Sequence, residues 1–326
     1  MKSYRFVIVA VTLTALLAAA AVLSLRLGAV ATPVQDVVQG LLSGDGLIWK
    51  YRLPRLIIAV LVGTNLALSG AILQGITRNP LAAPDIVGVS GGAGFAAVLV
   101  LLVFPALMSS ALPVTAFMGA ILAAALVYLI AYRPGGIEPS RLALTGVAIS
   151  AGFQAMIMLL IVKYALDSSQ ALVWLKGSLY ARTWKHVELL WPWTLVGLGL
   201  SLLCRRQFNA LQLDEDTVKG LGIRVQLVRL VLLCTAVGLA ASAVAIAGTI
   251  GFVGLVVPPL SKLLVGPDSS HFLPISALLG ALLVTLADML GRIILPPLEI
   301  PAGLVTALIG APYFIYVLSF RRPKSN

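Results

Sequence analysis

One stretch decides the fold: Arg52–Gly94 reads RLPRLIIAVLVGTNLALSGAILQGITRNPLAAPDIVGVSGGAG. Its apolar run from Leu56 to Ile76 is long enough to cross a bilayer as a helix, which takes about 20 residues. Pro80 and Pro84 cannot continue that helix, because proline lacks a backbone N–H and restricts the residue before it. The small residues of Gly88–Gly94 allow neighbouring helices to approach closely. We therefore predict a helical hairpin inside a packed bundle of membrane spans.

The composition is that of an integral membrane protein. Of the 326 residues, 60% are hydrophobic and 11% are charged, and the mean hydropathy is +1.04, whereas soluble domains carry about 25% charged residues. The net charge of +11 comes from 23 basic and 12 acidic residues. The basic residues lie at the ends of apolar runs, which fits membrane orientation and anionic lipid better than nucleic acid. We expect a single transmembrane domain over residues 1–326.

Ten apolar segments can be marked as membrane spans. Lipid cannot hydrogen-bond an exposed backbone, so each span must be helical, and the fold class is an all-α polytopic bundle. Ten spans place both termini on one side, and a cytoplasmic position for that side gives it most of the basic residues. The division between the seventh and eighth spans is the least secure. The predicted spans are Phe6–Leu25, Leu56–Ile76, Gly91–Leu112, Val114–Tyr132, Leu142–Val162, Leu189–Leu203, Leu227–Ala247, Ile250–Leu264, Ile275–Leu295 and Gly303–Phe320.

A set of short motifs, in a fixed order, resembles a known family: the membrane-spanning permeases of bacterial ATP-binding-cassette importers for iron–siderophores, haem and vitamin B12. The resemblance covers nearly the whole chain. The motifs are Arg52-Leu-Pro-Arg55, Gly70-Ala-Ile-Leu-Gln74, Arg78-Asn-Pro-Leu-Ala82, Gly88-Val-Ser-Gly-Gly-Ala93, Leu144-Thr-Gly-Val-Ala-Ile149, Trp174-Leu-Lys-Gly-Ser-Leu179, Gly251-Phe-Val-Gly-Leu-Val-Val-Pro258, Ile300-Pro-Ala-Gly303 and Gly310-Ala-Pro312.

The resemblance implies a fold like that of a type II ABC importer permease, in the bacterial cytoplasmic membrane with both termini in the cytoplasm. It implies a second permease subunit, identical or paralogous, and a cytoplasmic ATPase dimer that binds ATP and Mg. It also implies an extracytoplasmic substrate-binding protein. Ferric siderophore is the expected cargo, with haem and cobalamin as alternatives.

The cytoplasmic loop at about residues 208–226 has the pattern of a docking element. Its three consecutive acids suit the positive N-terminus of a short helix, and its two glycines suit the end of that helix. Its apolar residues indicate either a surface for a partner or a loop that packs back on the bundle. The resemblance implies coupling to the ATPase through Leu211, Leu213, Asp214, Glu215, Asp216, Val218, Lys219, Gly220, Leu221 and Gly222.

Arg52, Arg55 and Arg292 fall on the predicted outer side, where orientation rules disfavour basic residues. Either headgroup anchoring or docking to carboxylates of the binding protein explains Arg52 and Arg55, and the resemblance implies docking for all three. Asp288 lies one helical turn before Arg292, so an intrahelical ion pair is a competing explanation for Arg292. Asp288 is also the only acid well inside a predicted span, which makes it a candidate for function as well as for structure.

Four polar side chains inside the predicted spans are candidates for lining a transport pathway: Asn65, Gln74, Ser150 and Gln154. Asn65 and Gln74 are nine residues apart, which is about 180° around a helix, so we expect at least one of them to join helices instead. Ser150 and Gln154 are four residues apart and share a helix face.

The sequence disfavours enzymatic chemistry within this chain. It contains no Gly-Lys dipeptide and therefore no GxxxxGK phosphate-binding loop. It shows no nucleophile–base arrangement, and its two histidines, His186 and His271, are far apart. We therefore predict no catalytic residue, no metal and no cofactor in the chain, and no nucleic-acid partner. An ion-coupled secondary transporter is the alternative function, although only Asp288 suits an ion site, and an intramembrane enzyme is a third.

Overall fold

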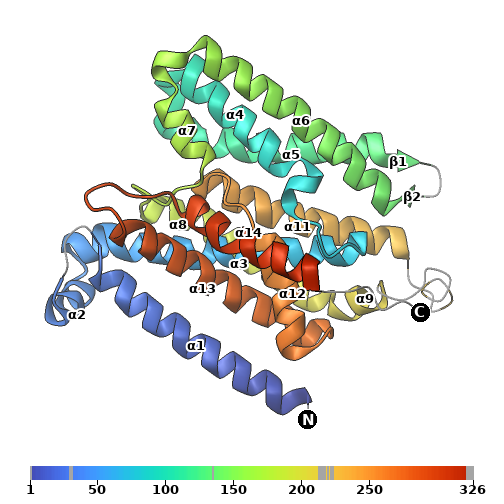
Figure 1. Ribbon diagram of the computed structural model, residues 1–326, viewed down its shortest axis with the longest axis horizontal. Coiled ribbons are helices and arrows are strands. Elements are labelled where there is room, and N and C mark those ends of the chain that lie inside the picture. Colours follow the sequence, from blue (N-terminus) through green and yellow to red (C-terminus); the bar gives the residue numbers. More distant parts are fainter. Residues whose placement is uncertain are drawn as a thin grey trace.

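The computed structural model describes residues 2–28, 32–133, 136–211, 218, 220 and 224–320. The helices form one bundle and run roughly along its long axis (Figure 1). α2 lies at one end of the bundle and the short β1–β2 hairpin lies at the other, and we call these the α2 end and the hairpin end.

The first half of the chain forms α1 (Lys2–Arg26), α2 (Val34–Ser43), a π-helical turn (Ile48–Arg52), α3 (Leu53–Thr77), a 3-10 turn (Pro84–Val87), α4 (Val89–Val103), a 3-10 turn (Pro105–Leu107), α5 (Met108–Ala131), β1 (Tyr132–Arg133), β2 (Gly136–Ile137) and α6 (Pro139–Lys163). The second half forms a 3-10 turn (Ala165–Asp167), α7 (Ser169–Leu175), α8 (Trp184–Leu203), α9 (Arg205–Ala210), α11 (Val225–Ala247), α12 (Val253–Val265), α13 (Ser269–Ile293) and α14 (Ala302–Phe320).

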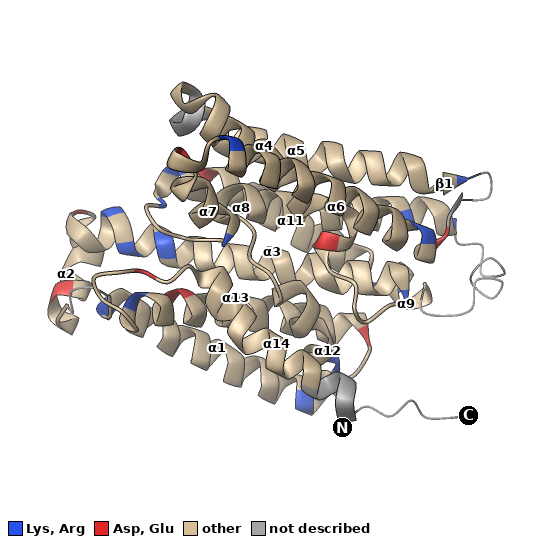
Figure 2. Cartoon of the chain, turned by 45° about the horizontal axis from the view of Figure 1, so that its top comes forward, with Lys and Arg blue, Asp and Glu red and all other residues tan. Residues whose placement is uncertain are grey.

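The ten predicted spans are confirmed as ten separate helices: α1, α3, α4, α5, α6, α8, α11, α12, α13 and α14. Within the described residues, seven helices are long and apolar enough to cross a membrane. Three apolar helices are shorter: Val89–Val103, Val253–Val265 and Ala302–Ile315. Figure 2 shows that the charged residues are concentrated toward the two ends of the bundle, whereas the central parts of the helices carry few of them. This distribution is the one that a membrane requires.

α3 and α11 form the centre of the bundle. In their most apolar stretches, 78% and 83% of the residues are buried, compared with 11% in α1 and in α6. Glycines allow α3 to pack directly against the backbones of its neighbours. A Cβ atom on Gly63 would lie 2.1 Å from the Gly280 carbonyl oxygen of α13, and one on Gly70 would lie 2.0 Å from the Gly254 oxygen of α12. The close helix packing that the small-residue motif indicated therefore extends into α3 itself.

The Pro-rich elbow after α3 folds back into the bundle. Pro84 and Val87 are buried, and Pro84 lies beside Gly254, which also approaches the Leu66 carbonyl in the middle of α3. The next helix, α4, therefore begins inside the bundle and not at its surface. This depth accounts for the 15-residue length of α4, which is shorter than the predicted span.

Two predicted boundaries need correction. The span predicted as Gly91–Leu112 ends at Val103, because Pro105 cannot supply a helical N–H, and residues from Met108 onward belong to α5. The division between the seventh and eighth spans lies at Gly248–Phe252. The φ angles of Gly248 and Phe252 are 73° and 68°, and this left-handed backbone separates α11 from α12.

Candidate functional site

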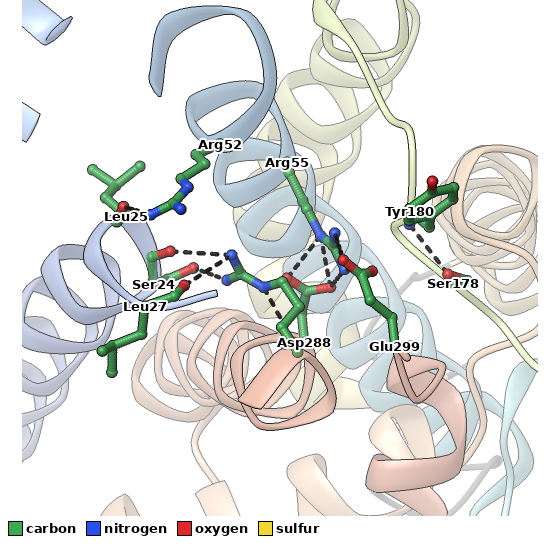
Figure 3. Close-up of polar contacts among 10 residues, drawn as sticks. Ser24, Leu25, Leu27, Arg52, Arg55, Ser178, Tyr180, Asp288 and Glu299 are labelled. Carbon is green, nitrogen blue, oxygen red and sulfur yellow. Dashed lines mark hydrogen bonds and ion pairs between the residues drawn. The ribbon is translucent and has the colours of Figure 1, made fainter. Parts of the chain in front are cut away.

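Charged residues from three parts of the chain meet at the α2 end. We call Arg52, Arg55, Asp288, Arg292 and Glu299 the arginine cluster. Arg52 ends the π-helical turn that leads into α3, and Arg55 lies in the first turn of α3. Asp288 and Arg292 lie one turn apart on α13, and Glu299 lies in the loop that leads to α14. Figure 3 shows Arg55 between the carboxylates of Asp288 and Glu299.

Arg55 binds two carboxylates, those of Asp288 and Glu299. Its Nη2 atom lies 2.8 Å from Asp288 Oδ1 and 2.8 Å from Glu299 Oε2, and its Nε donates to both Asp288 oxygens at 3.1 Å. The side chains of Arg55 and Asp288 are only 13% and 3% exposed, whereas that of Glu299 is 27% exposed. Two-pronged contacts of this kind are typical of arginine with carboxylates.

The other two arginines bind the end of α1. Arg292 donates to Asp288 at 3.3 Å, so the predicted intrahelical ion pair is confirmed, and it also donates to Ser24 Oγ at 2.6 Å. Arg52 donates to the carbonyl oxygens of Leu25 and Arg26 at 2.7 and 3.0 Å. These contacts satisfy carbonyl groups that the last turn of a helix leaves open.

The geometry gives the three arginines different access to a partner. Arg292 is buried and its contacts in this structure are internal, so an external carboxylate does not reach it in this conformation. Arg55 is 13% exposed, and the more exposed Glu299 binds its guanidinium. Arg52 is part-buried. Docking through Arg52 and Arg55 stays a prediction.

Glu299 is the residue of this site that was not predicted from the sequence. It lies 244 residues from Arg55, in the segment Pro296-Pro-Leu-Glu-Ile-Pro301 between the last two spans. One signal was available: this acid falls on the same side of the predicted membrane as the unexplained arginines. Charge balance on that side could therefore have suggested the pair.

Asn65 and Gln74 are buried and join helices to one another. Asn65 is fully buried and its Nδ2 donates to Ser242 of α11 at 3.2 Å. Gln74 is 3% exposed and its Nε2 donates to the carbonyl oxygens of Gly254 and Leu255 at 3.2 Å. The expectation that at least one of them joins helices is met by both. Both side chains are buried in this structure, and pathway lining by them stays a prediction.

Ser150 and Gln154 of α6 are four residues apart on one helix and so share a face, as their spacing predicted. Ser150 donates to the backbone oxygen of Asp85 at 3.1 Å. Gln154 is exposed and lines a cavity of about 500 Å³, together with Asp85 and Lys176. The cavity therefore brings a carboxylate, an ammonium group and an amide to one place between α4, α6 and the segment after α7. Pathway lining by Ser150 and Gln154 stays a prediction.

The predicted coupling loop packs back on the bundle where the structure describes it. Leu211 and Val218 are 3% and 1% exposed and belong to the main hydrophobic core, and the guanidinium of Arg78 binds the Leu211 carbonyl at 3.1 Å. An exposed apolar patch at these two positions is therefore wrong, although Gly220 is exposed. Leu213, Asp214, Glu215, Asp216, Lys219, Leu221 and Gly222 lie outside the described residues. Among the described residues, no group of three His, Cys, Asp or Glu side chains is placed to hold a metal.

Comparison with known proteins identifies the family. A model of the FecCD transport family matches residues 16–320. The chain belongs to this family. As a FecCD chain it is a permease subunit of an ATP-binding-cassette importer and a multi-pass membrane protein, and not an enzyme.

Relatives match this FecCD chain along nearly its whole length. It is 44% identical to the Fe(3+)-citrate import system permease protein YfmE of Bacillus subtilis, over 99% of this chain and 98% of the relative. It is 41% identical to the Fe(3+) dicitrate transport system permease protein FecD of Escherichia coli, over 94% and 96%. A solved structure, described as an inward-facing conformation of a putative metal-chelate type ABC transporter, shares 33% identity with a TM-score of 0.84 and covers 97% of this chain and 99% of its own.

Proposed function

We propose that this permease passes a ferric chelate, of the siderophore or ferric citrate type, into the cytoplasm. The observation that carries the proposal is the end-to-end similarity to the ferric citrate permease of Bacillus subtilis, at 44% identity over 99% of the chain. The metal-chelate type of the solved neighbour supports the same class of cargo. Haem and cobalamin are the alternatives within the same kind of importer.

The proposal includes a second permease subunit facing α6. Several large apolar side chains on this helix are more than half exposed, among them Leu144 at 73% and Leu159 at 68%. The polar Gln154 lies among them and lines the cavity that holds Asp85 and Lys176. A pathway between two subunits needs such a face, in which apolar contacts surround a few polar groups.

The proposal also includes a binding protein at the α2 end and an ATPase at the hairpin end. At the α2 end, the Glu299 carboxylate forms an ion pair with Arg55, and a carboxylate of the binding protein would form the same kind of pair. At the hairpin end, Arg205 and Arg206 of α9 are exposed and precede the predicted coupling segment. Both termini are proposed to lie on this cytoplasmic side.

Asp288, the acid inside a predicted span, does not support the alternative of ion-coupled transport. Asp288 contacts Arg55 at 2.8 Å and Arg292 at 3.3 Å. A carboxylate with two guanidinium partners has its charge satisfied by the protein, so it is not available for a transported cation.

Uptake by a strain that lacks this gene tests the cargo. Accumulation of radioactive iron is measured from ferric citrate, a hydroxamate siderophore and a catecholate siderophore, with haem and labelled cobalamin as further arms. We expect the deletion to abolish uptake of at least one ferric chelate, and the restored gene to recover it. Loss of haem or cobalamin uptake with all ferric chelates unaffected would exclude the proposed cargo and retain the importer.

A further inference from the structure

A cavity of about 640 Å³, lined by none of the five residues of the arginine cluster, lies toward the α2 end of the bundle (Figure 1). Its walls come from the end of α4, the start of α5, α7 and the first turn of α8. Leu101, Leu112 and Val173 supply apolar surface, whereas Trp174, Arg182 and His186 supply polar groups. The cavity is therefore amphipathic, and its polar groups lie near the end of the bundle.

Two buried donors in the wall of this cavity have no acceptor. Trp174 is 6% exposed, and its indole Nε1 is buried with no hydrogen-bond partner in the described part of the chain. The same holds for the Nε atom of Arg182. His186 Nδ1 accepts the Thr183 N–H at 3.2 Å, so the neutral ring carries its proton on Nε2. Burial of a donor without an acceptor is unfavourable, and an acceptor in the cavity would recover that loss.

The positive charge of Arg182 in the cavity wall favours an anionic ligand. Arg182 is the charged residue among the described side chains of its wall, and no carboxylate lines it there. Burial lowers the pKa of Arg182 to about 10, which leaves the guanidinium protonated at neutral pH. A partly buried guanidinium is strongly stabilised by an anion that accepts hydrogen bonds, and phosphate oxygens match its planar fork.

An apolar cleft continues from the cavity along the outside of the bundle. It has a volume of about 220 Å³ and shares Pro113 with the larger cavity. Val114 and Phe117 of α5 face Leu189 and Trp193 of α8 across it, and the Phe117 and Trp193 ring centroids are 4.8 Å apart. Val114 and Leu189 are more than half exposed. The cleft therefore offers a hydrocarbon chain an apolar path that meets the larger cavity at Pro113.

Neighbouring aromatic residues place the cavity at the level of lipid headgroups. Trp184 begins α8 and donates from Nε1 to the Trp49 carbonyl at 2.9 Å, with the two rings 5.2 Å apart. Tyr180 lines the cavity and is 64% exposed, and its N–H binds Ser178 (Figure 3). Tryptophan and tyrosine are enriched at this depth in membrane proteins.

We propose that the cavity and the cleft together bind one anionic phospholipid of the outer leaflet. Its phosphate accepts hydrogen bonds from Arg182 and Trp174, and one acyl chain lies in the cleft between α5 and α8. The lipid bridges the α4–α5 pair and α8 at the place where the donors of Trp174 and Arg182 lack an acceptor. Uncharged phospholipids bind more weakly, because they do not compensate the charge of Arg182.

Lipid retained by the purified full-length chain tests the proposal. The protein is delipidated in detergent and titrated with phosphatidylglycerol, with phosphatidylcholine and inorganic phosphate as separate arms, and binding is followed by native mass spectrometry. Arg182→Gln removes the charge and Trp174→Phe removes one donor while keeping an aromatic ring. Val114→Trp fills the cleft without altering the donors. Lys185→Gln is the matched control, since Lys185 is exposed and does not line the cavity.

We expect Arg182→Gln to weaken phosphatidylglycerol binding about tenfold, the size of a lost charged hydrogen bond. Trp174→Phe should weaken it severalfold, and Lys185→Gln should leave it unchanged. Val114→Trp should weaken binding of long-chain phosphatidylglycerol and leave a dihexanoyl form unaffected. Equal affinity of wild type and Arg182→Gln, equal affinity for phosphatidylcholine, or displacement of the lipid by millimolar phosphate would each overturn the proposal. Native spectra of intact protein confirm that the variants are folded.

Discussion

Asp288 is the residue on which the arginine cluster depends. It is 3% exposed and contacts both Arg55 and Arg292. Among the described residues, the ion pair of Glu299 is with Arg55, and Glu299 is far more exposed, at 27%. Removal of one partner from a buried ion pair leaves an uncompensated buried charge, which costs far more than removal of an exposed partner.

Asp288→Asn should therefore destabilise the protein much more than Glu299→Gln. The expected losses in free energy of unfolding are about 3–5 kcal/mol for the first and about 1 kcal/mol or less for the second. Apparent melting temperatures in one detergent, followed by fluorescence-detected size exclusion, compare the variants. Similar melting temperatures for the two variants would show that Asp288 does not hold the cluster together.

Binding of the substrate-binding protein should depend on Arg55 and not directly on Arg292. Arg55→Glu repels the incoming carboxylate that would replace Glu299, so we expect weaker docking in nanodiscs. Because the new carboxylate also faces the buried Asp288, Asp288→Asn, which disturbs the cluster and keeps Arg55, is the control for loss of folding. Added salt should weaken docking to wild type, because exposed charge pairs are screened over about 8 Å at physiological ionic strength. Arg292→Ala should act on stability first. Equal affinities and equal salt dependence for wild type and Arg55→Glu would argue against docking at this residue.

At the scale of elements, α3 is the helix around which the bundle is packed. It touches α13 through Gly63 and Gly280, and α12 through Gly70 and Gly254. Membrane helices have no hydrophobic drive to associate in lipid, so close backbone contact of this kind supplies the packing energy. α6 represents the opposite case, since it is largely exposed.

Gly70→Ala and Gly152→Ala should have opposite effects. A methyl group on Gly70 would lie 2.0 Å from the Gly254 oxygen, whereas one on Gly152 of α6 would meet no neighbouring atom of the described residues within 4 Å. We expect Gly70→Ala to cost more than the roughly 1–3 kcal/mol of ordinary overpacking. Gly152→Ala should stabilise by about 0.5–1 kcal/mol, as alanine does inside a helix. Melting temperatures test both, and a harmless Gly70→Ala would mean that α3 and α12 can separate easily.

Coupling to the ATPase should depend on the exposed face of α9. Arg205→Glu together with Arg206→Glu should reduce co-purification of the ATPase while the permease still folds, because both arginines are exposed. Val218→Asp is the contrasting variant. Val218 is 1% exposed, so a carboxylate there should impair folding of the permease itself. If the ATPase co-purifies equally well when the charges of both arginines are reversed, the docking surface does not include α9.

At the scale of the whole molecule, the two ends of the bundle carry different candidate binding sites. The α2 end holds the arginine cluster and the donor-lined cavity, whereas the hairpin end holds α9 and the predicted coupling segment (Figure 1). Transport across the membrane requires these ends to face opposite compartments.

Cysteine labelling should show which end is outside. Cys204 and Cys234 are first replaced by serine, and single cysteines are placed at Ser43 in the last turn of α2 or at Arg133 in β1, both of which are exposed. In intact spheroplasts, a membrane-impermeant maleimide should label Ser43→Cys, and it should label Arg133→Cys only after the membrane is opened. The reverse result would invert the proposed topology.

The sequence predicted the ten helices because the length of an apolar run and the requirement for backbone hydrogen bonds are local properties. The ion pair of Asp288 with Arg292 was local as well, at one helical turn. The partners of Arg55 were not predictable in this way, because they lie 233 and 244 residues away. The burial of Leu211 and Val218 and the inward fold of Pro84 depend on neighbours from other helices, which periodicity cannot identify.

Arg55 leaves the ribosome long before its partners. The 244 residues that separate it from Glu299 take about 12–50 seconds to translate at roughly 5–20 residues per second. During that time the guanidinium has neither carboxylate, and an unpaired charge is costly in hydrocarbon. The start of α3 must therefore wait at the lipid–water boundary or beside the insertion machinery. The start of α3 can reach its final position only after the last two helices are made. A chain truncated before α13 would lack both carboxylates that pair with Arg55, those of Asp288 and Glu299.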